Sequence, residues 1–151
     1  MLAEYTMKNE FFLEFEVGDY VFIVENNGTS VWGYLTEKNG DILRDVFICS
    51  PIVPEDELDA QHIKQGNPPK LCKASATETA FIENISQAAI SIEHIENFAY
   101  CVKYLNEPIA AIYLSENRGF SKSLSSVCGF GNPWSEKAYE LSFGNGSHTN
   151  K

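Results

Sequence analysis

Apolar and polar residues alternate near the start of the chain in the way that a half-buried β-strand requires. In residues 10–17, EFFLEFEV, every odd-numbered position is apolar, and the even-numbered positions hold three glutamates and Phe12. A period of two predicts a strand with one face in the core. The glutamates and Phe12 should share the opposite face.

Three more strands are predicted directly after it, at residues 20–25, 29–37 and 41–49. The turns between them contain Asn26-Asn27-Gly28 and Lys38-Asn39-Gly40. Asn-Gly pairs favour hairpin turns because both residues tolerate a positive φ. Four strands joined by such short turns predict an antiparallel meander.

Residues 50–74 interrupt this pattern. Pro51 and Pro54 end the pairing, since proline cannot donate a hydrogen bond to a β-ladder. The segment then runs through a cluster of acids towards a second proline pair. We expect a long irregular loop, in which residues 56–63 could form a helical turn or two. Loops longer than about 12–15 residues are uncommon and are often functional or disordered.

One helix is predicted after the loop. Ser75 and Glu78 have the spacing of a capping box, and apolar residues recur behind them at helical intervals, which favours a helix over 76–90. The last part of this stretch, ISI, also suits a strand.

The remaining residues predict further strands. Residues 97–105 and 109–116 have the pattern of a hairpin, Ser135 could cap a short turn, and residues 138–143, AYELSF, favour a last strand. The expected fold is therefore α+β: a mainly antiparallel sheet of about seven strands, beginning with the meander, with one helix packed on it.

The composition is that of one folded domain. Of the 151 residues, 44% are hydrophobic and 13% are aromatic, as in globular rather than disordered proteins. We expect a single globular domain over 1–143 and a flexible polar tail over 144–151. The chain shows no signal-peptide pattern and no run of roughly 18 apolar residues, so we expect a cytoplasmic protein without a membrane span.

The negative charge is unevenly distributed. Residues 1–59 hold 13 acids and three bases, whereas residues 60–151 hold eight of each, so the first part carries the whole net charge of −10. Nucleic acid and anionic lipid are disfavoured as partners because both require clustered lysine and arginine. A basic protein partner is favoured, since a surface of one sign attracts molecules of the opposite sign.

Metal, cofactor and catalytic motifs are weak or missing in the sequence. The four cysteines lie 23, 29 and 27 positions apart with no C-x-x-C, which disfavours zinc, and we expect no metal and no cofactor. Gly129-Phe130-Gly131 lacks the third glycine of a dinucleotide loop. A cysteine hydrolase that uses Cys128 or Cys101 with His94 is an alternative, because such pairs meet in space rather than in sequence.

Two sets of residues are candidates for binding a partner. The loop acids could form an electrostatic contact with a basic protein or could simply be solvated. Trp32 and Tyr34 share one side of the third strand; they could belong to a sheet covered on both faces, or could anchor an interface, where Trp and Tyr are enriched. The candidate partner-binding residues are Glu55, Asp56, Glu57, Asp59, Trp32 and Tyr34.

Two segments carry a resemblance to a known class of proteins. VWGYLTEKNGDILRDVFICSPIVPEDE (31–57) and NFAYCVKYLNEPIAAIYLSENRGFSKS (97–123) resemble the small acidic immunity proteins of bacterial toxin–immunity systems, including the contact-dependent growth inhibition type. The resemblance implies a non-enzymatic protein that binds one toxin domain and blocks it. Many such toxins are nucleases with a basic cleft, which an acidic inhibitor suits. A generic ligand-binding module is a further alternative.

Overall fold

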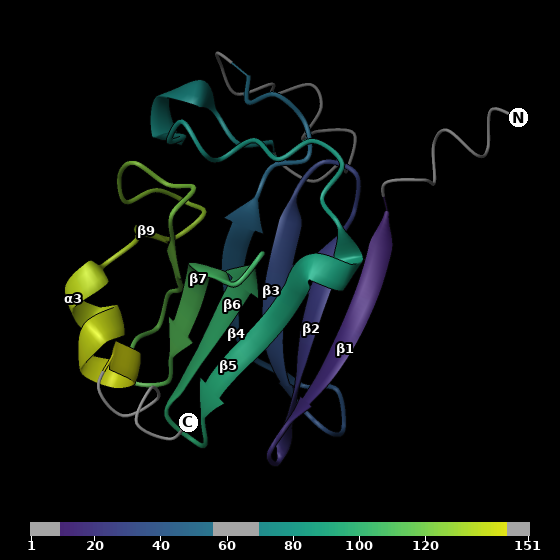
Figure 1. The fold of residues 1–151 in the computed structure, drawn as a ribbon, viewed down its shortest axis with the longest axis vertical. Coiled ribbons are helices and arrows are strands. Elements are labelled where there is room, and N and C mark those ends of the chain that lie inside the picture. Colours follow the sequence, from purple (N-terminus) through teal and green to yellow (C-terminus); the bar gives the residue numbers. More distant parts are fainter. Residues whose placement is uncertain (1–9, 56–69, 145–151) are drawn as a thin grey trace, which may run out of the picture.

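The chain folds into two β-sheets that lie face to face, with a short helical segment near the C-terminus (Figure 1). The computed structural model describes residues 10–55 and 70–144. In order along each sheet, the strands are β1 (Phe11–Val17), β2 (Tyr20–Asn26), β3 (Val31–Glu37) and β4 (Ile42–Cys49), and then β5 (Ile90–Ile95), β6 (Ala99–Tyr104), β7 (Glu107–Tyr113), β8 (Phe120–Ser121) and β9 (Asn132–Pro133).

The four-stranded sheet confirms the predicted meander. Its strands follow one another in chain order and each pair is antiparallel. The turn after β3 closes with a hydrogen bond from the Gly40 N–H to the Glu37 carbonyl, 2.8 Å. Gly40 has a φ of 101°, which explains the preference for glycine there because other residues are strained at positive φ.

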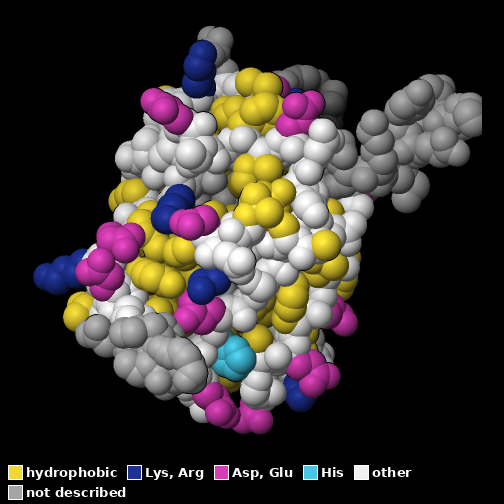
Figure 2. Space-filling view, viewed as in Figure 1, with side chains coloured by type: hydrophobic (Ala, Val, Ile, Leu, Met, Phe, Trp, Pro, Cys, Tyr) yellow, Lys and Arg dark blue, Asp and Glu magenta, His cyan; other side chains and the backbone are white. Residues whose placement is uncertain are grey.

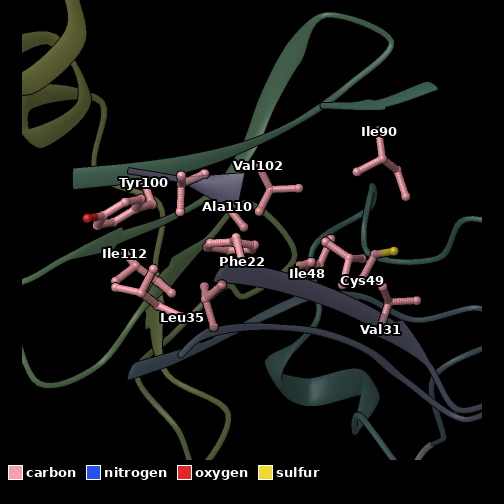
Figure 3. Close-up of a cluster of buried hydrophobic side chains, with 13 residues drawn as sticks. Phe22, Val31, Leu35, Ile48, Cys49, Ile90, Tyr100, Val102, Ala110 and Ile112 are labelled. Carbon is pink, nitrogen blue, oxygen red and sulfur yellow. The ribbon is translucent and has the colours of Figure 1, made fainter. Parts of the chain in front are cut away.

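The main core lies between the two sheets. Phe22 and Leu35 from the four-stranded sheet point towards Tyr100 and Ile112 from the five-stranded sheet (Figure 3), and all four are buried. Gly33 also faces this core, and a Cβ placed on it would come within 2.8 Å of the Phe22 ring. The phenylalanine ring therefore occupies the space that any larger residue at position 33 would need.

The prediction of one sheet with about seven strands is wrong. The second half forms its own five-stranded sheet, because β6 and β7 pair with β5 and β8 rather than with β4. The backbone of Ser50, at the end of β4, bonds instead to the neighbours of Phe81: its N–H donates to the Ala80 carbonyl, and its carbonyl accepts from the Ile82 N–H. The coarser expectation holds, since the fold is mostly β with little helix.

The predicted helix over 76–90 is also wrong. The stretch contains only a short 3₁₀ helix, Gln87–Ala89, before β5 begins at Ile90. The backbone of Thr77 instead donates to the Ser123 carbonyl, and Asn84 has a left-handed φ of 58°. Pairing with distant segments has therefore outweighed the local helical spacing, and the isoleucines of ISI belong to a strand.

The C-terminal segment is helical, which contradicts the predicted strand over 138–143. A short α-helix, α3 (Glu136–Tyr139), continues as a π-helix, η3 (Glu140–Gly144). The hydroxyl of Ser135 caps α3 by accepting a hydrogen bond from the Ala138 N–H, as its residue type suggested. Phe143 is buried against Cys101 and Tyr113, so this segment covers the side of the five-stranded sheet that faces away from the main core.

The long loop is irregular where the structure describes it. A 3₁₀ helix, η1 (Lys73–Ser75), lies near its end, and Glu55 forms a bridge with Cys72. The helical turn expected over 56–63 lies outside the described residues, as does almost all of the tail over 144–151. The single domain over 1–143 stays a prediction.

Candidate partner-binding surface

The face of the four-stranded sheet that points away from the core carries alternate residues of β1 to β4. One cross-strand row contains Glu14, Ile23, Tyr34 and Asp45, each opposite the next. These residues lie on one face because side chains alternate along each strand and opposed residues share a side. We call this surface the outer face; its members are Phe12, Glu14, Glu16, Ile23, Glu25, Tyr34, Ile42 and Asp45.

Apolar side chains form the centre of the outer face. Phe12, Ile23, Tyr34 and Ile42 line a hollow of about 330 Å³. Phe12 is 57% exposed and Ile42 is 61% exposed. Two large apolar side chains this exposed beside a tyrosine form a patch of the kind that marks interaction sites.

Four carboxylates share the outer face, and one of them, Glu25, lines the hollow. Glu14 and Glu16 are exposed on β1, Asp45 is exposed on β4, and Glu25 is partly buried beside Trp32. The pKa of the Tyr34 hydroxyl is raised by burial and then by the negative charges of Glu25 and Asp45. Burial also raises the pKa of Asp45, against the lowering effect of Arg118.

Lys38 and Arg44, the described bases of the first part of the chain, form no ion pair with these acids. Among the described residues, none of the four carboxylates forms an ion pair with a lysine or arginine. Arg44 donates hydrogen bonds to the carbonyls of Leu43, Leu114 and Glu116 instead, each at 2.9 Å. Arg118, the base that acts on Asp45, donates to the Cys128 carbonyl.

The opposite side of the molecule has a different charge pattern. Figure 2 looks onto the side that carries β5 to β7, where acidic and basic side chains are interspersed. Lys103 pairs there with Glu93 at 3.1 Å, and Tyr139 donates to the same carboxylate at 3.3 Å. Glu55 and Glu93 are the only acids in the described ranges that form an ion pair, so unpaired carboxylates also occur away from the outer face. The outer face differs in that none of the residues that form it is a lysine or arginine.

Trp32 lies on the same side of the sheet as Tyr34, but other aromatic residues cover it. Its ring stacks on Phe130 with 5.7 Å between centroids and meets Phe47 edge-on at 5.4 Å. Its indole N–H donates to the Ser30 hydroxyl at 3.1 Å. Trp32 thus supports one end of the outer face, whereas Tyr34 lines the open hollow.

The loop acids are only partly described. Glu55 forms an ion pair with Lys70 at 2.8 Å, with both side chains partly exposed. Asp56, Glu57 and Asp59 lie outside the described residues. The structure therefore shows one of the four predicted loop acids, and that one has a basic neighbour.

The structure does not bring Cys101 or Cys128 together with His94, as the cysteine hydrolase alternative requires. Cys101 is fully buried, and burial raises the pKa of its thiol to about 12, which disfavours the reactive thiolate. Cys101 lies opposite Glu93 whereas His94 lies opposite Tyr100, so the Cys101 and His94 side chains project from opposite faces of the sheet. Cys128 belongs to the cluster around Phe47 and Leu124, while His94 stacks on Tyr100.

Within residues 10–55 and 70–144, no group of three or more histidine, cysteine or acidic side chains is placed to hold a metal ion. No helix in the same ranges has the length and apolar character needed to cross a membrane. Comparisons with known protein families, curated proteins and solved structures gave no match to this chain.

Sequence reasoning named Tyr34 but not the other members of the outer face. The alternation in β1 already placed Glu14 and Glu16 with Phe12 on one side. The register of the strand pairs was not predicted. That register places these residues in rows with Glu25, Ile42 and Asp45. A period-two pattern read across all four strands of the meander could have found this surface.

Proposed function

We propose that this protein binds a cationic protein domain on the outer face and neutralises it, as an immunity protein does for its toxin. The observation that carries the proposal is that four carboxylates, without ion pairs among the described residues, share one sheet face with an exposed apolar hollow. Like charges held together on a sheet repel one another. A partner with lysines and arginines would relieve that repulsion.

The two parts of the surface would have different roles in binding. Charge complementarity chiefly accelerates association, with rate constants up to about 10⁸–10⁹ M⁻¹s⁻¹ at low salt against 10⁵–10⁶ for neutral pairs. The lifetime of a complex depends on a few buried anchors, among which Tyr is enriched. We therefore assign capture to the carboxylates and retention to Tyr34, with Phe12 and Ile42 beside it.

The proposed partner is a toxin domain with a basic cleft of the nuclease type, and the proposed location is the cytoplasm, where such a toxin would act. Fast capture suits this role because the inhibitor must reach the toxin before the toxin reaches its substrate. The loop acids Asp56, Glu57 and Asp59 stay candidate contacts in this proposal, and Glu55 would contribute less because Lys70 pairs with it.

The test uses the cationic domain encoded by the gene immediately upstream, with association measured by biolayer interferometry at 50 and 300 mM salt. Glu14→Lys/Glu16→Lys should lower the association rate at least tenfold at 50 mM salt. Tyr34→Ala should raise the dissociation rate at least tenfold. Glu78→Lys/Glu83→Lys is the matched control, because it makes the same charge change in the loop before β5 and should leave both rates within twofold.

Three outcomes would contradict the proposal. The upstream gene could encode no cationic domain, the domain could fail to bind, or the control pair could slow association as much as the outer-face pair. If Asp56→Lys/Glu57→Lys alone slows association, the loop and not the outer face is the docking site. Cytochrome c serves as a cationic control protein. If it binds as tightly as the encoded domain does, the attraction is non-specific.

A further inference from the structure

Two of the four cysteines share a cavity. Cys72 and Cys128 both line a pocket of about 320 Å³ between the end of the long loop and the turn that carries Phe130. Both are partly buried and both are free thiols. Cys49 and Cys101, by contrast, are fully buried in β4 and β6.

Backbone contacts join the two segments that carry these cysteines. Ala76 and Leu124 form an antiparallel bridge, and the Ser125 N–H donates to the Ser75 carbonyl at 2.9 Å. Cys72 lies four residues before Ala76, and Cys128 lies four residues after Leu124. The 3₁₀ helix η1 interrupts the chain between Cys72 and Ala76, so the two segments lie side by side without a continuous ladder, and the Ser125 hydroxyl donates to the Ala74 carbonyl at 3.4 Å.

Contacts on the far side hold both cysteines in place. Glu55 bridges to Cys72, with its N–H donating to the Leu71 carbonyl at 3.1 Å. The Cys128 N–H donates to the Gly131 carbonyl at 3.0 Å. Both thiols are thus attached to backbone that is hydrogen-bonded on either side of the shared cavity. A disulfide needs a Cα separation of about 4.4–6.8 Å, so closure requires the two segments to bring Cys72 and Cys128 to that separation across the shared cavity.

We infer that Cys72 and Cys128 form a dithiol site that closes reversibly to an intramolecular disulfide by exchange with a small-molecule disulfide such as oxidised glutathione. The thiolate of one cysteine attacks a sulfur of glutathione disulfide, which forms a mixed disulfide and releases one glutathione thiolate. The second cysteine attacks the protein sulfur of the mixed disulfide and releases the second glutathione. The two thiol protons end on the two glutathione molecules, and the two electrons reduce one S–S bond as another forms.

Closure would fasten two parts of the structure together. Cys72 ends the long loop, and Cys128 starts the turn whose Phe130 covers Trp32 and Phe47. The disulfide would therefore tie the loop to the aromatic cover at one end of the outer face. Cys49 and Cys101 would not compete, because burial raises the pKa of each thiol to about 12 and so removes the attacking thiolate.

The experiment equilibrates the full chain in glutathione buffers from fully reduced to fully oxidised, then blocks free thiols in acid-quenched samples and maps the peptides by mass spectrometry. We expect a species lighter by two hydrogens, with residues 72 and 128 in one linked peptide and with two blocked thiols, on Cys49 and Cys101. The oxidised protein should also show a thermal midpoint raised by roughly 5–10 °C.

Single variants distinguish pairing from mere exposure. In Cys72→Ser the remaining Cys128 should hold glutathione as a stable mixed disulfide, and in Cys128→Ser the remaining Cys72 should do the same. Cys49→Ser should close as the unaltered chain does. Two separate glutathione adducts on the unaltered chain, a link that involves Cys49 or Cys101, or no reaction would each overturn the inference. A link that forms equally well in urea would also do so, since the folded structure would then play no part.

Discussion

Replacing Glu14 by glutamine should make the free protein more stable. Glu14 and Glu16 are two positions apart on one strand, about 6.8 Å at a rise of about 3.4 Å per residue. Glu25 is the diagonal neighbour of Glu14 across β1 and β2, at about 7–8 Å. The Glu14→Gln variant therefore removes two like-charge contacts and, among the described residues, breaks no ion pair.

The expected gain follows from Coulomb's law. Two unit charges about 7 Å apart in water repel by about 0.6 kcal/mol, so the two contacts together amount to about 1 kcal/mol. Some repulsion persists in the unfolded chain, and we expect a net gain of about 0.5–1 kcal/mol in the free energy of unfolding at 10 mM salt. At 1 M salt the Debye length falls to about 3 Å, and the gain should almost vanish.

Urea unfolding at both salt concentrations measures this effect. Glu93→Gln is the comparison variant, since it removes the ion pair with Lys103 and should lower the unfolding free energy by about 0.5 kcal/mol. If Glu14→Gln lowers the stability, or raises it equally at both salt concentrations, the carboxylates of the outer face are not mutually repelling and the electrostatic reasoning fails.

Three other predictions follow from packing and protonation. Gly33→Val should lower the unfolding free energy by at least about 2 kcal/mol, because the Phe22 ring fills the space that the valine side chain would need. The control Gly129→Ala, whose added methyl group meets open space, should change it by less than about 0.5 kcal/mol. Urea unfolding of both variants measures these changes. Arg44→Lys should lower the unfolding free energy by about 1–2 kcal/mol, because it removes hydrogen bonds that join β4 to residues 114–116. An unchanged midpoint of urea unfolding would contradict this prediction. Under reducing conditions, the free energy of unfolding should keep its full contribution from the thiols of Cys49 and Cys101 below the unfolded thiol pKa of about 8.5. It should fall as the pH rises towards the folded pKa of about 12 of both thiols. An unfolding free energy that stays constant between pH 8 and 10.5 would refute this.

Local patterns predicted the first half of the fold because each signal there is short-range. The alternation in β1 and the turns at Asn27-Gly28 and Lys38-Asn39-Gly40 depend on neighbouring residues only, and the four strands formed where these patterns indicated. The start of the short helix at Ser135 could be predicted for the same reason, since its cap bonds to a residue only three positions away.

The second half was harder to predict because distant partners determine its structure. The segment over 76–90 has helical spacing, yet Thr77 and Ala80 bond to Ser123 and Ser50. Residues 138–143 alternate like a strand, but Phe143 packs on the five-stranded sheet from a helical backbone. These contacts with distant residues cannot be predicted from the local sequence pattern.

The candidate site was only partly predictable for a related reason. The charge excess of residues 1–59 and the position of Tyr34 were visible in the sequence. The placement of Glu14, Glu25 and Asp45 on one face depends on the register of three strand pairs, which the sequence does not state directly. The covering of Trp32 by Phe130 joins residues about a hundred positions apart.

The central claim is that a cationic domain docks on the outer face. Hydroxyl-radical footprinting of the free protein and of its complex with the upstream-encoded cationic domain tests this claim most directly, because it reports the exposure of individual side chains. We predict that oxidation of Phe12, Tyr34 and Ile42 slows several-fold in the complex, while Phe98 and Leu105, which are exposed beside the five-stranded sheet, react as before. Protection of Phe98 and Leu105 with unchanged oxidation of Phe12, Tyr34 and Ile42 would contradict the account.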